Sequence, residues 1–289
     1  MVRTIGIIGH AQAPSFEEGL RELGWIEGKN VTFERRLSTD PTELAKFAAE
    51  LVRIPVDVIF AGNAASTRAA VEATRAIPII TVSADPVKTG VASSVSRPGA
   101  NVTGFAITQL MGKRLEMLVE AIPTARRVAF LVNPTNPNTP AFRREAEAVA
   151  RAKGVKLLAF EVSGPEQIEA ALAAVAKARP DACIVAGDPV FTVAQQRLIV
   201  AAARHRMPTM WEYRAFVEAG GLMSYGAYTG DLYRGAATYA DRILKGTRPA
   251  DLPIDQATRF ELSINLKTAH ILNITIPRPV LLRADHVVQ

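Results

Sequence analysis

The chain has 289 residues, of which 48% are hydrophobic and 21% charged. This composition is typical of a globular protein, and the length exceeds what one hydrophobic core usually fills, so we expect two domains or one large α/β domain. A formal net charge of +6 and a pI of about 9.6 would suggest a nucleic-acid partner. Because Lys and Arg are scattered over the predicted helix faces, we expect no nucleic-acid binding.

The single cysteine, Cys183, excludes an internal disulfide framework and a multi-cysteine metal site. It lies in the apolar run Ala182 to Ala186, so we expect a buried strand residue rather than a nucleophile. No run approaches the roughly 18 apolar residues of a membrane-spanning helix, so we predict no transmembrane segment. The chain begins Met1-Val2-Arg3-Thr4 and enters a strand at once, so we expect no signal peptide in it; the alternatives are a cytoplasmic protein and a sequence that begins after a removed leader.

The first predicted elements alternate strand and helix. Thr4 to Gly9 is predicted as a buried strand, and Ser15 to Leu23 as a short helix. Val31 to Arg35 alternates apolar and polar residues, which predicts a strand near a sheet edge. Asp40-Pro41-Thr42-Glu43 predicts a helix start, because it combines a capping acceptor, a proline at the first position and a glutamate three residues after the cap.

The stretch from Pro55 to Phe105 carries the first candidate site. A predicted strand, Val56 to Ala61, ends in the polar turn Gly62-Asn63-Ala64-Ala65-Ser66-Thr67, from which a helix starts. A second strand, Ile77 to Val82, ends in Ser83-Ala84-Asp85-Pro86. Parallel sheets bind ligands at the carboxyl ends of their strands, and free N–H groups at a helix start favour an anionic group. The alternative for Ser66 is that it caps a helix running from Thr67 onward.

The following residues repeat the order of apolar strand, polar turn and amphipathic helix, which predicts two βα sheets. The expected strands are Asn101 to Phe105, Val128 to Val132, Val155 to Val162 and Ala182 to Ala186, and the expected helices are Gln109 to Ile122, Thr139 to Lys153 and Pro165 to Ala178.

Two Asp-Pro turns follow predicted strands, one with Asp85 and one with Asp188. Asp-Pro commonly opens a turn, and that is the alternative to ligand contact for each carboxylate. If both touch ligand, we expect them to face each other across a cleft. We also predict that Asp188→Ala weakens binding more than tenfold without lowering the melting temperature much.

The segment from Met207 to Gly246 brings Trp211 and Tyr213 together at a predicted strand end. The two aromatic rings either belong to the core or form a stacking wall for a planar ligand. Glycines flank the next predicted strand, Leu222 to Tyr225, as a hinge would require. Asp231 to Leu244 is predicted as a helix stopped by Gly246.

Residue patterns for catalysis are missing from the sequence. The four histidines are dispersed, and no metal-ligand spacing, phosphate-binding glycine loop or nucleophile elbow occurs. Ser66 is flanked by Ala65 and Thr67 rather than by glycines. We therefore predict a protein that is not an enzyme and that carries no cofactor and no metal.

Longer blocks of the sequence indicate a family. They are GLRELGWIEGKNV (Gly19 to Val31), the stretch Asp57 to Phe105 with DPVKTG and RPGANVTG, FVEAGGLMSYG (Phe216 to Gly226), YADRILKGTRPADLPIDQATRFELSINLKTA (Tyr239 to Ala269) and TIPRPVLLRADHV (Thr275 to Val287). Together they resemble the substrate-binding proteins of ABC importers, of the tryptophan/tyrosine type. The resemblance covers nearly the whole chain.

This resemblance implies a type I periplasmic-binding-protein fold: two Rossmann-like α/β lobes with parallel sheets, joined by a three-segment hinge. The N-terminal lobe would comprise residues 1–104 plus 227–257, and the C-terminal lobe residues 105–226 plus 258–289. Crossings are expected near Thr103 to Phe105, Tyr225 to Ala227 and Ala257 to Arg259. Family members are exported, so the resemblance implies a periplasmic or extracytoplasmic location and a leader absent from this sequence.

The resemblance also assigns a cleft wall to each lobe. It places Asn63, Ala64, Ala65, Ser66, Ser83 and Asp85 in the first lobe, and Asn133, Asp188, Trp211 and Tyr213 in the second. The chain departs from the family between His10 and Phe16, where a usually longer loop is shortened. Since that loop normally contributes to the cleft, an aromatic amino acid is not assumed as the ligand.

The predicted function is capture of a small polar or aromatic solute, such as an amino acid or a similar carboxylate or amine, by closure of two lobes. The predicted partners are this small-molecule ligand and the membrane permease of an ABC importer. An anionic group would bind the N–H groups of Ala65 and Ser66, and a donor group would pair with Asp85 or Asp188. The alternatives are the sensor domain of a lactose-repressor-type regulator, or an α/β enzyme acting on a small molecule.

Overall fold

The structure is a computed structural model that describes residues 2–9, 13–84, 86–87, 90–96, 98–99, 101–108 and 110–289, with the side chains of Ala13 and Ala84 not described. The chain divides into two compact units: unit 1 is Met1–Thr108 with Thr229–Thr258, and unit 2 is Gln109–Tyr228 with Arg259–Gln289. The chain therefore passes between units at 108/109, 228/229 and 258/259, beside the expected boundaries at 104/105, 226/227 and 257/258.

Unit 1 is built on a six-stranded parallel sheet with the strand order β11-β5-β4-β3-β1-β2. The central strands are buried on both faces, which explains their continuous apolar runs. The strands are β1 (Arg3–Gly9), β2 (Val31–Leu37), β3 (Val58–Ala61), β4 (Ile79–Ala84), β5 (Val102–Ile107) and β11 (Ile254–Gln256).

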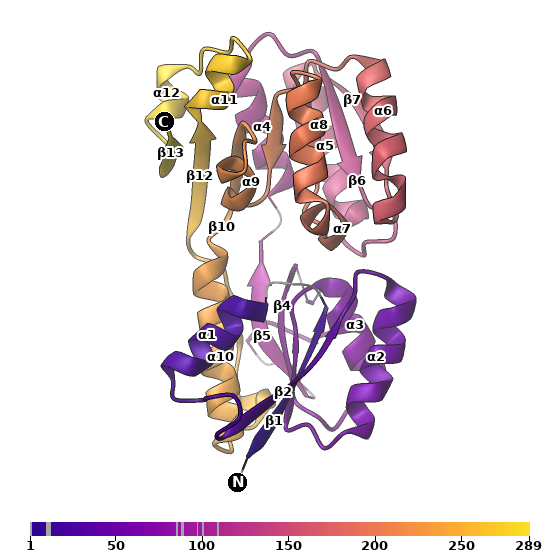
Figure 1. Cartoon of the computed structure of the whole chain (residues 1–289), viewed down its shortest axis with the longest axis vertical. Coiled ribbons are helices and arrows are strands. Elements are labelled where there is room, and N and C mark those ends of the chain that lie inside the picture. Colours follow the sequence, from indigo (N-terminus) through magenta and orange to yellow (C-terminus); the bar gives the residue numbers. More distant parts are fainter. Residues whose placement is uncertain are drawn as a thin grey trace. The chain divides into compact units, whose positions relative to one another are not determined.

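Four helices cover this sheet, α1 and α10 on one face and α2 and α3 on the other (Figure 1). Asp40 caps α2 as predicted, since its carboxylate accepts from the N–H groups of Thr42 and Glu43. Glu43 does not complete a capping box with Asp40 but accepts from the Ser38 hydroxyl. The helices are α1 (Ala13–Glu22), α2 (Pro41–Arg53), α3 (Ala64–Ala73) and α10 (Thr229–Leu244), with a 3₁₀ turn at Pro249–Asp251.

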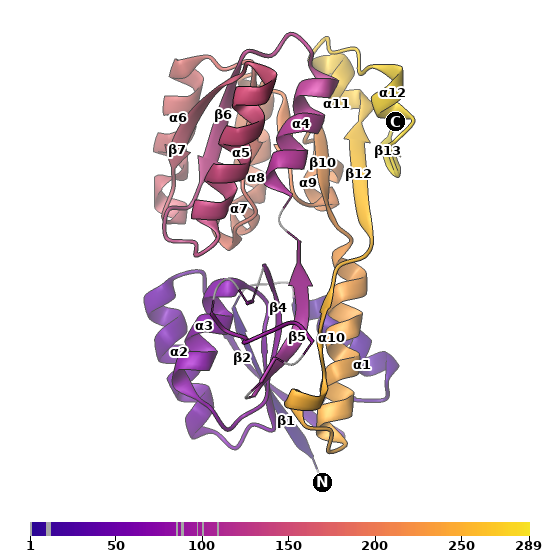
Figure 2. The ribbon, with the colours of Figure 1, turned by 180° about the vertical axis from the view of Figure 1, so that it is seen from behind.

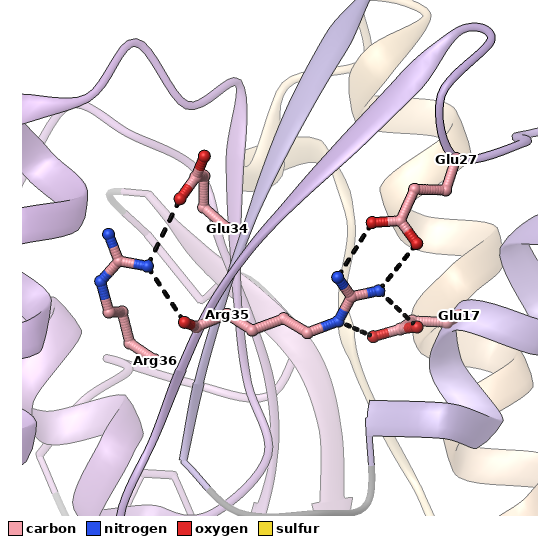
Figure 3. A network of polar contacts seen from close by, with 5 residues as sticks. All are labelled: Glu17, Glu27, Glu34, Arg35 and Arg36. Atoms are coloured by element: carbon pink, nitrogen blue, oxygen red, sulfur yellow. Dashed lines mark hydrogen bonds and ion pairs between the residues drawn. The ribbon is translucent and has the colours of Figure 1, made fainter.

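Strand β2 forms an edge of this sheet, as its alternating pattern predicts. Arg35 reaches from β2 to Glu17 on α1 and to Glu27 in the following loop, with two hydrogen bonds to each carboxylate (Figure 3). Arg36 bonds Glu34 on the same strand. These charges occupy a sheet edge that would otherwise offer unpaired backbone groups to other strands.

Unit 2 is built on a seven-stranded sheet with the order β13-β12-β10-β9-β8-β6-β7. Strand β12 runs antiparallel to β10 and all other pairs are parallel, so parallel pairing dominates this sheet, in agreement with the predicted fold class. The strands are β6 (Arg127–Val132), β7 (Lys156–Glu161), β8 (Ala182–Val185), β9 (Thr209–Trp211), β10 (Met223–Ala227), β12 (Phe260–Asn265) and β13 (His286–Val288).

Helices α4 and α5 cover one face of this sheet (Figure 2), and α6, α8 and α9 cover the other (Figure 1). Gly154 ends α5 in the left-handed conformation that favours glycine. Cys183 lies buried in β8, as predicted. The helices are α4 (Met111–Ala121), α5 (Thr139–Lys153), α6 (Ile168–Ala178), α7 (Pro189–Val193), α8 (Gln195–Arg204), α9 (Arg214–Glu218), α11 (Leu266–Ile271) and α12 (Arg278–Leu281), with a 3₁₀ turn at Pro165–Gln167.

Candidate functional site

Both sheets contain a topological switch point, where successive strand connections leave in opposite directions. In unit 1 it lies between β1 and β3, and in unit 2 between β6 and β8. The crevice beyond the carboxyl ends of such strands is where open α/β sheets bind ligands. Asn63 follows β3, Asn133 follows β6 and Asp188 follows β8, so these three predicted site residues lie at the switch points of their own units.

In unit 1, Asn63 rather than Ser66 caps the helix that follows β3. The Asn63 Oδ1 accepts from the Ser66 N–H at 2.9 Å, and the Ser66 hydroxyl oxygen accepts from the Asn63 N–H at 3.2 Å, which completes a capping box. Helix α3 begins at Ala64, so the expectation of a cap at Ser66 and a helix from Thr67 is wrong. The Ser66 N–H is committed to this cap, whereas the helix-start N–H groups of Ala64 and Ala65 have no hydrogen-bond acceptor among the residues that the structure describes.

Further donors lie near this helix start. The Asn63 Nδ2 is buried and has no hydrogen-bond partner among the residues that the structure describes. Gly9, at the end of β1, packs against it, since a Cβ on Gly9 would lie 2.9 Å from Nδ2. Ser83, at the end of β4, accepts from the Thr81 hydroxyl at 2.8 Å and so keeps its own proton for another acceptor. Unit 1 therefore offers several hydrogen-bond donors at its switch point.

In unit 2, Asp188 is the N-cap of α7 and is 6% exposed. Its carboxylate accepts from the Val190 N–H at 2.8 Å, from Asn136 Nδ2 at 2.7 Å, and from Asn133 Nδ2 at 3.2 Å to each oxygen. Burial raises the pKa of Asp188, the hydrogen bonds from Asn136, Val190 and Asn133 oppose that rise, and the nearby charge of Glu212 adds to it. The aspartate is thus part of the structure of the loop.

The two asparagines beside Asp188 are also fully engaged. Asn133 Oδ1 accepts from the N–H and the hydroxyl of Thr135 at 3.0 and 2.8 Å. Asn136 Oδ1 accepts from the Asn138 N–H at 2.8 Å. The structure therefore brings Asn133 and Asp188 together, as the prediction of a shared site requires, but in a network whose bonds are mostly internal.

The two aromatic residues of the predicted stacking wall differ in exposure. Trp211 is 2% exposed, its indole N–H donates to the Thr209 hydroxyl at 2.8 Å, and its ring stacks on Phe216 with centroids 4.4 Å apart. Its environment matches the alternative of a core aromatic. Tyr213 is half-buried at the edge of the same core. Ligand contact by Trp211 or Tyr213 stays a prediction.

A buried ion pair that the sequence analysis did not identify lies beside Asp188. Arg114 on α4 is 1% exposed in its side chain and donates from Nη2 to Glu212 Oε1 at 2.6 Å and from Nε to the Tyr225 carbonyl at 2.8 Å. Gly187 and Gly226 make room for Glu212, because a Cβ on Gly187 would collide with its carboxylate and a Cβ on Gly226 with its carbonyl. Gly226 therefore allows close packing against Glu212, and its expected role in a hinge stays a prediction.

The remaining predictions concern Asp85, the loop at His10, Cys183, metal ligands and membrane-spanning helices. Asp85 and the shortened loop at His10 lie outside the described residues. Burial raises the pKa of Cys183 to about 12, which keeps the thiol protonated. Among the described residues there is no group of three His, Cys, Asp or Glu side chains that could hold a metal ion. Within the same part of the chain, no helix combines the length and apolar character needed to cross a membrane.

The strand orders and their switch points define an α/β fold of two doubly wound units, and comparison with solved structures supports this class. A conserved domain protein from Vibrio cholerae has a TM-score of 0.91 and 26% identity, with 99% of this chain and 100% of that chain covered. A Streptococcus pneumonia ABC domain in complex with L-Trp has a TM-score of 0.91 and 24% identity, with 100% of both chains covered. The fold is that of type I periplasmic binding proteins, as the resemblance implied.

The family follows from the sequence comparison. The family model described as ABC transporter substrate binding protein matches residues 10–288. A tyrosine-binding protein of Clostridioides difficile (strain R20291) is 24% identical over 281 residues, which cover 94% of this chain and 81% of that protein. The chain belongs to the ABC transporter substrate-binding protein family.

Proposed function

We propose that this protein captures an amino acid, or a similar small molecule with a carboxylate and an amine, and delivers it to the membrane permease of an ABC importer outside the cytoplasm. The observation that carries the proposal is the opposite chemistry of the two switch points. Unit 1 offers the N–H groups of Ala64 and Ala65 and the Nδ2 of Asn63, which has no partner within the described part of the chain. Unit 2 offers the buried carboxylate of Asp188 and the partly buried carboxylate of Glu212.

Donors of this kind suit a carboxylate, because charge-assisted hydrogen bonds to an anion are about twice as strong as neutral ones. Carboxylates suit an ammonium group for the same reason. The donors of unit 1 thus match one charged group of a zwitterion, and the carboxylates of unit 2 match the other. We expect binding without chemical conversion, since the described residues of the site provide hydrogen-bonding groups and do not include a nucleophile paired with a base.

The relatives support this ligand class. One is named for tyrosine binding, and one solved structure holds L-Trp. Tyr213 is the side chain best exposed to lie against an aromatic ligand body, whereas Trp211 supports it from the core. We keep the ligand at the level of an amino acid, because the two relatives differ in the amino acid that their names give.

The test is isothermal titration calorimetry with the twenty L-amino acids, followed by the des-amino and decarboxylated analogues of whichever binds best. We expect one or a few amino acids to bind with a dissociation constant near the micromolar range, about −8 kcal/mol, and both analogues to bind at least tenfold more weakly. Recovery of unchanged ligand by mass spectrometry checks the absence of turnover. Equal affinity for an analogue lacking either charged group would contradict the proposal.

A further inference from the structure

Asp188 has little capacity left for a ligand. An ionised carboxylate has about four acceptor positions, and the four contacts from Asn133, Asn136 and Val190 occupy them. Each donor is anchored in turn, the asparagines by their own loop and Val190 by α7. A ligand ammonium group could reach Asp188 only by displacing one of these internal bonds.

Glu212 has the capacity that Asp188 lacks. Its Oε1 accepts from Arg114, while Oε2 accepts no hydrogen bond from any of the residues that the structure describes. This free oxygen lies against Gly187, the residue before Asp188, and it is not sealed from solvent, because the Glu212 side chain is 11% exposed. A small hollow in unit 2 is lined by Gly187, Asp188, Glu212 and Tyr213, among others.

The ion pair is also incomplete on its cationic side. Arg114 uses Nε and Nη2, but its Nη1 is buried without a partner in the described part of the chain. Leaving a buried donor unpaired costs about 1–3 kcal/mol, so native structures seldom keep one without a purpose. The pair therefore has one open acceptor and one open donor at the carboxyl end of β9, beside the switch point of unit 2.

We propose that Glu212 Oε2, and not Asp188, is the carboxylate oxygen that accepts from the ligand amine, and that Arg114 is a positioning residue that fixes Glu212. This inference rests on the proposed function and assigns its cationic subsite. Asp188 then shapes the loop through Asn133 and Asn136. Because Arg114 also bonds the Tyr225 carbonyl of β10, it holds Glu212 at a defined distance from the strand that leads to the crossing at 228/229.

The test uses the amino acid that binds best in the calorimetric screen and the same molecule without its amine, for instance L-tyrosine and 3-(4-hydroxyphenyl)propanoate. For Glu212→Gln we expect at least a tenfold loss of affinity for the amino acid and less than a twofold change for the des-amino acid. Asp188→Asn should change both affinities by the same factor. Binding of the des-amino acid reports that each variant is folded.

Glu212→Asp serves as a second variant that keeps the charge paired with Arg114 but withdraws the carboxylate by one methylene. It should give a smaller amine-dependent loss than Glu212→Gln. In a Glu212→Gln background, Arg114→Lys should add no further amine-dependent loss, because a positioning residue has nothing left to position.

Three results would overturn the inference. Equal losses for both ligands in Glu212→Gln would show a structural role alone, and an amine-dependent loss confined to Asp188→Asn would return the subsite to Asp188. If the wild-type protein bound none of the twenty amino acids, the proposed function itself would fail, and the assignment of Glu212 with it. The first two results leave the proposed function intact.

Discussion

Each unit has an asparagine at its switch point, after β3 in unit 1 and after β6, the counterpart of β1, in unit 2, and the two asparagines have opposite tasks. The orders β2-β1-β3-β4-β5 and β7-β6-β8-β9-β10 are equivalent, and an asparagine follows a switch-point strand in each. In unit 1 that residue, Asn63, bonds backbone amides and leaves Nδ2 open. In unit 2 Asn133 gives its Nδ2 to a carboxylate. The fold sets where ligand groups meet the protein, and the neighbouring side chains set the sign of charge they accept.

The largest expected effect is a loss of stability when the ion pair between Arg114 and Glu212 in unit 2 is broken. Arg114→Met leaves Glu212 as a nearly buried carboxylate without its partner, which should lower the free energy of unfolding by about 3–5 kcal/mol. Urea denaturation measures this change. The matched control is Arg35→Met in unit 1, which removes four hydrogen bonds to two glutamates (Figure 3).

Arg35 is 35% exposed in its side chain, so solvent screens its ion pairs and we expect a loss below about 1 kcal/mol. Comparing the two variants therefore tests whether the number of hydrogen bonds or their burial determines the loss in the free energy of unfolding. Similar losses for the two variants would show that burial of the Arg114 pair does not decide its contribution.

The next effect concerns the loop of unit 2. Asp188→Ala removes a helix cap, worth about 1 kcal/mol, and leaves the Nδ2 groups of Asn133 and Asn136 without their acceptor. We expect a loss of about 2–3 kcal/mol in the free energy of unfolding, together with weaker ligand binding. The control is Asp40→Ala, an exposed cap of α2, with a loss of about 1 kcal/mol. A melting temperature unchanged by Asp188→Ala would contradict this estimate and agree with the expectation drawn from the sequence.

That expectation shows what a local pattern can and cannot predict. Strand and helix positions followed from apolar periodicity and caps, which involve residues close in the sequence. Several small polar residues at one turn can each cap the following helix. The pattern favours Ser66 as the cap of α3, whereas the structure has Asn63, three residues earlier, in that role. The bond between Arg114 and Glu212 joins residues 98 positions apart, so no local pattern contains it. The sequence contains one indication of this pair: Arg114 is a cation on the apolar face of α4, four residues from both Leu110 and Leu118.

A smaller effect is expected from changing Asn63 in unit 1, and it tests whether this switch point favours an anionic group. Asn63→Asp keeps the acceptor that caps α3 but replaces the open Nδ2 donor with a negatively charged oxygen. We expect the free energy of unfolding to change by less than about 0.5 kcal/mol, because a helix N-terminus favours an anion. Affinity for an amino acid should fall at least tenfold through repulsion of its carboxylate, as calorimetry would show. The decarboxylated amine should bind as it does to the wild-type protein, and an equal loss for both ligands would contradict a carboxylate site at Asn63.

The smallest effect is a pH dependence confined to unit 2. Burial holds the pKa of Asp188 above its ordinary value, so the unfolded chain loses this proton at a lower pH than the folded protein does. As pH rises between those two values, the unfolded state binds fewer protons, and the free energy of unfolding falls by at most about 1.4 kcal/mol for each pH unit. Urea denaturation from pH 4 upward, taken as wild type minus Asp188→Asn, isolates this slope, because the raised pKa of Glu261 contributes to both proteins. Asn63 and the backbone amides of unit 1 do not titrate in this range, so a matching slope in wild type minus Asn63→Ala would mean that the two switch points are not chemically distinct.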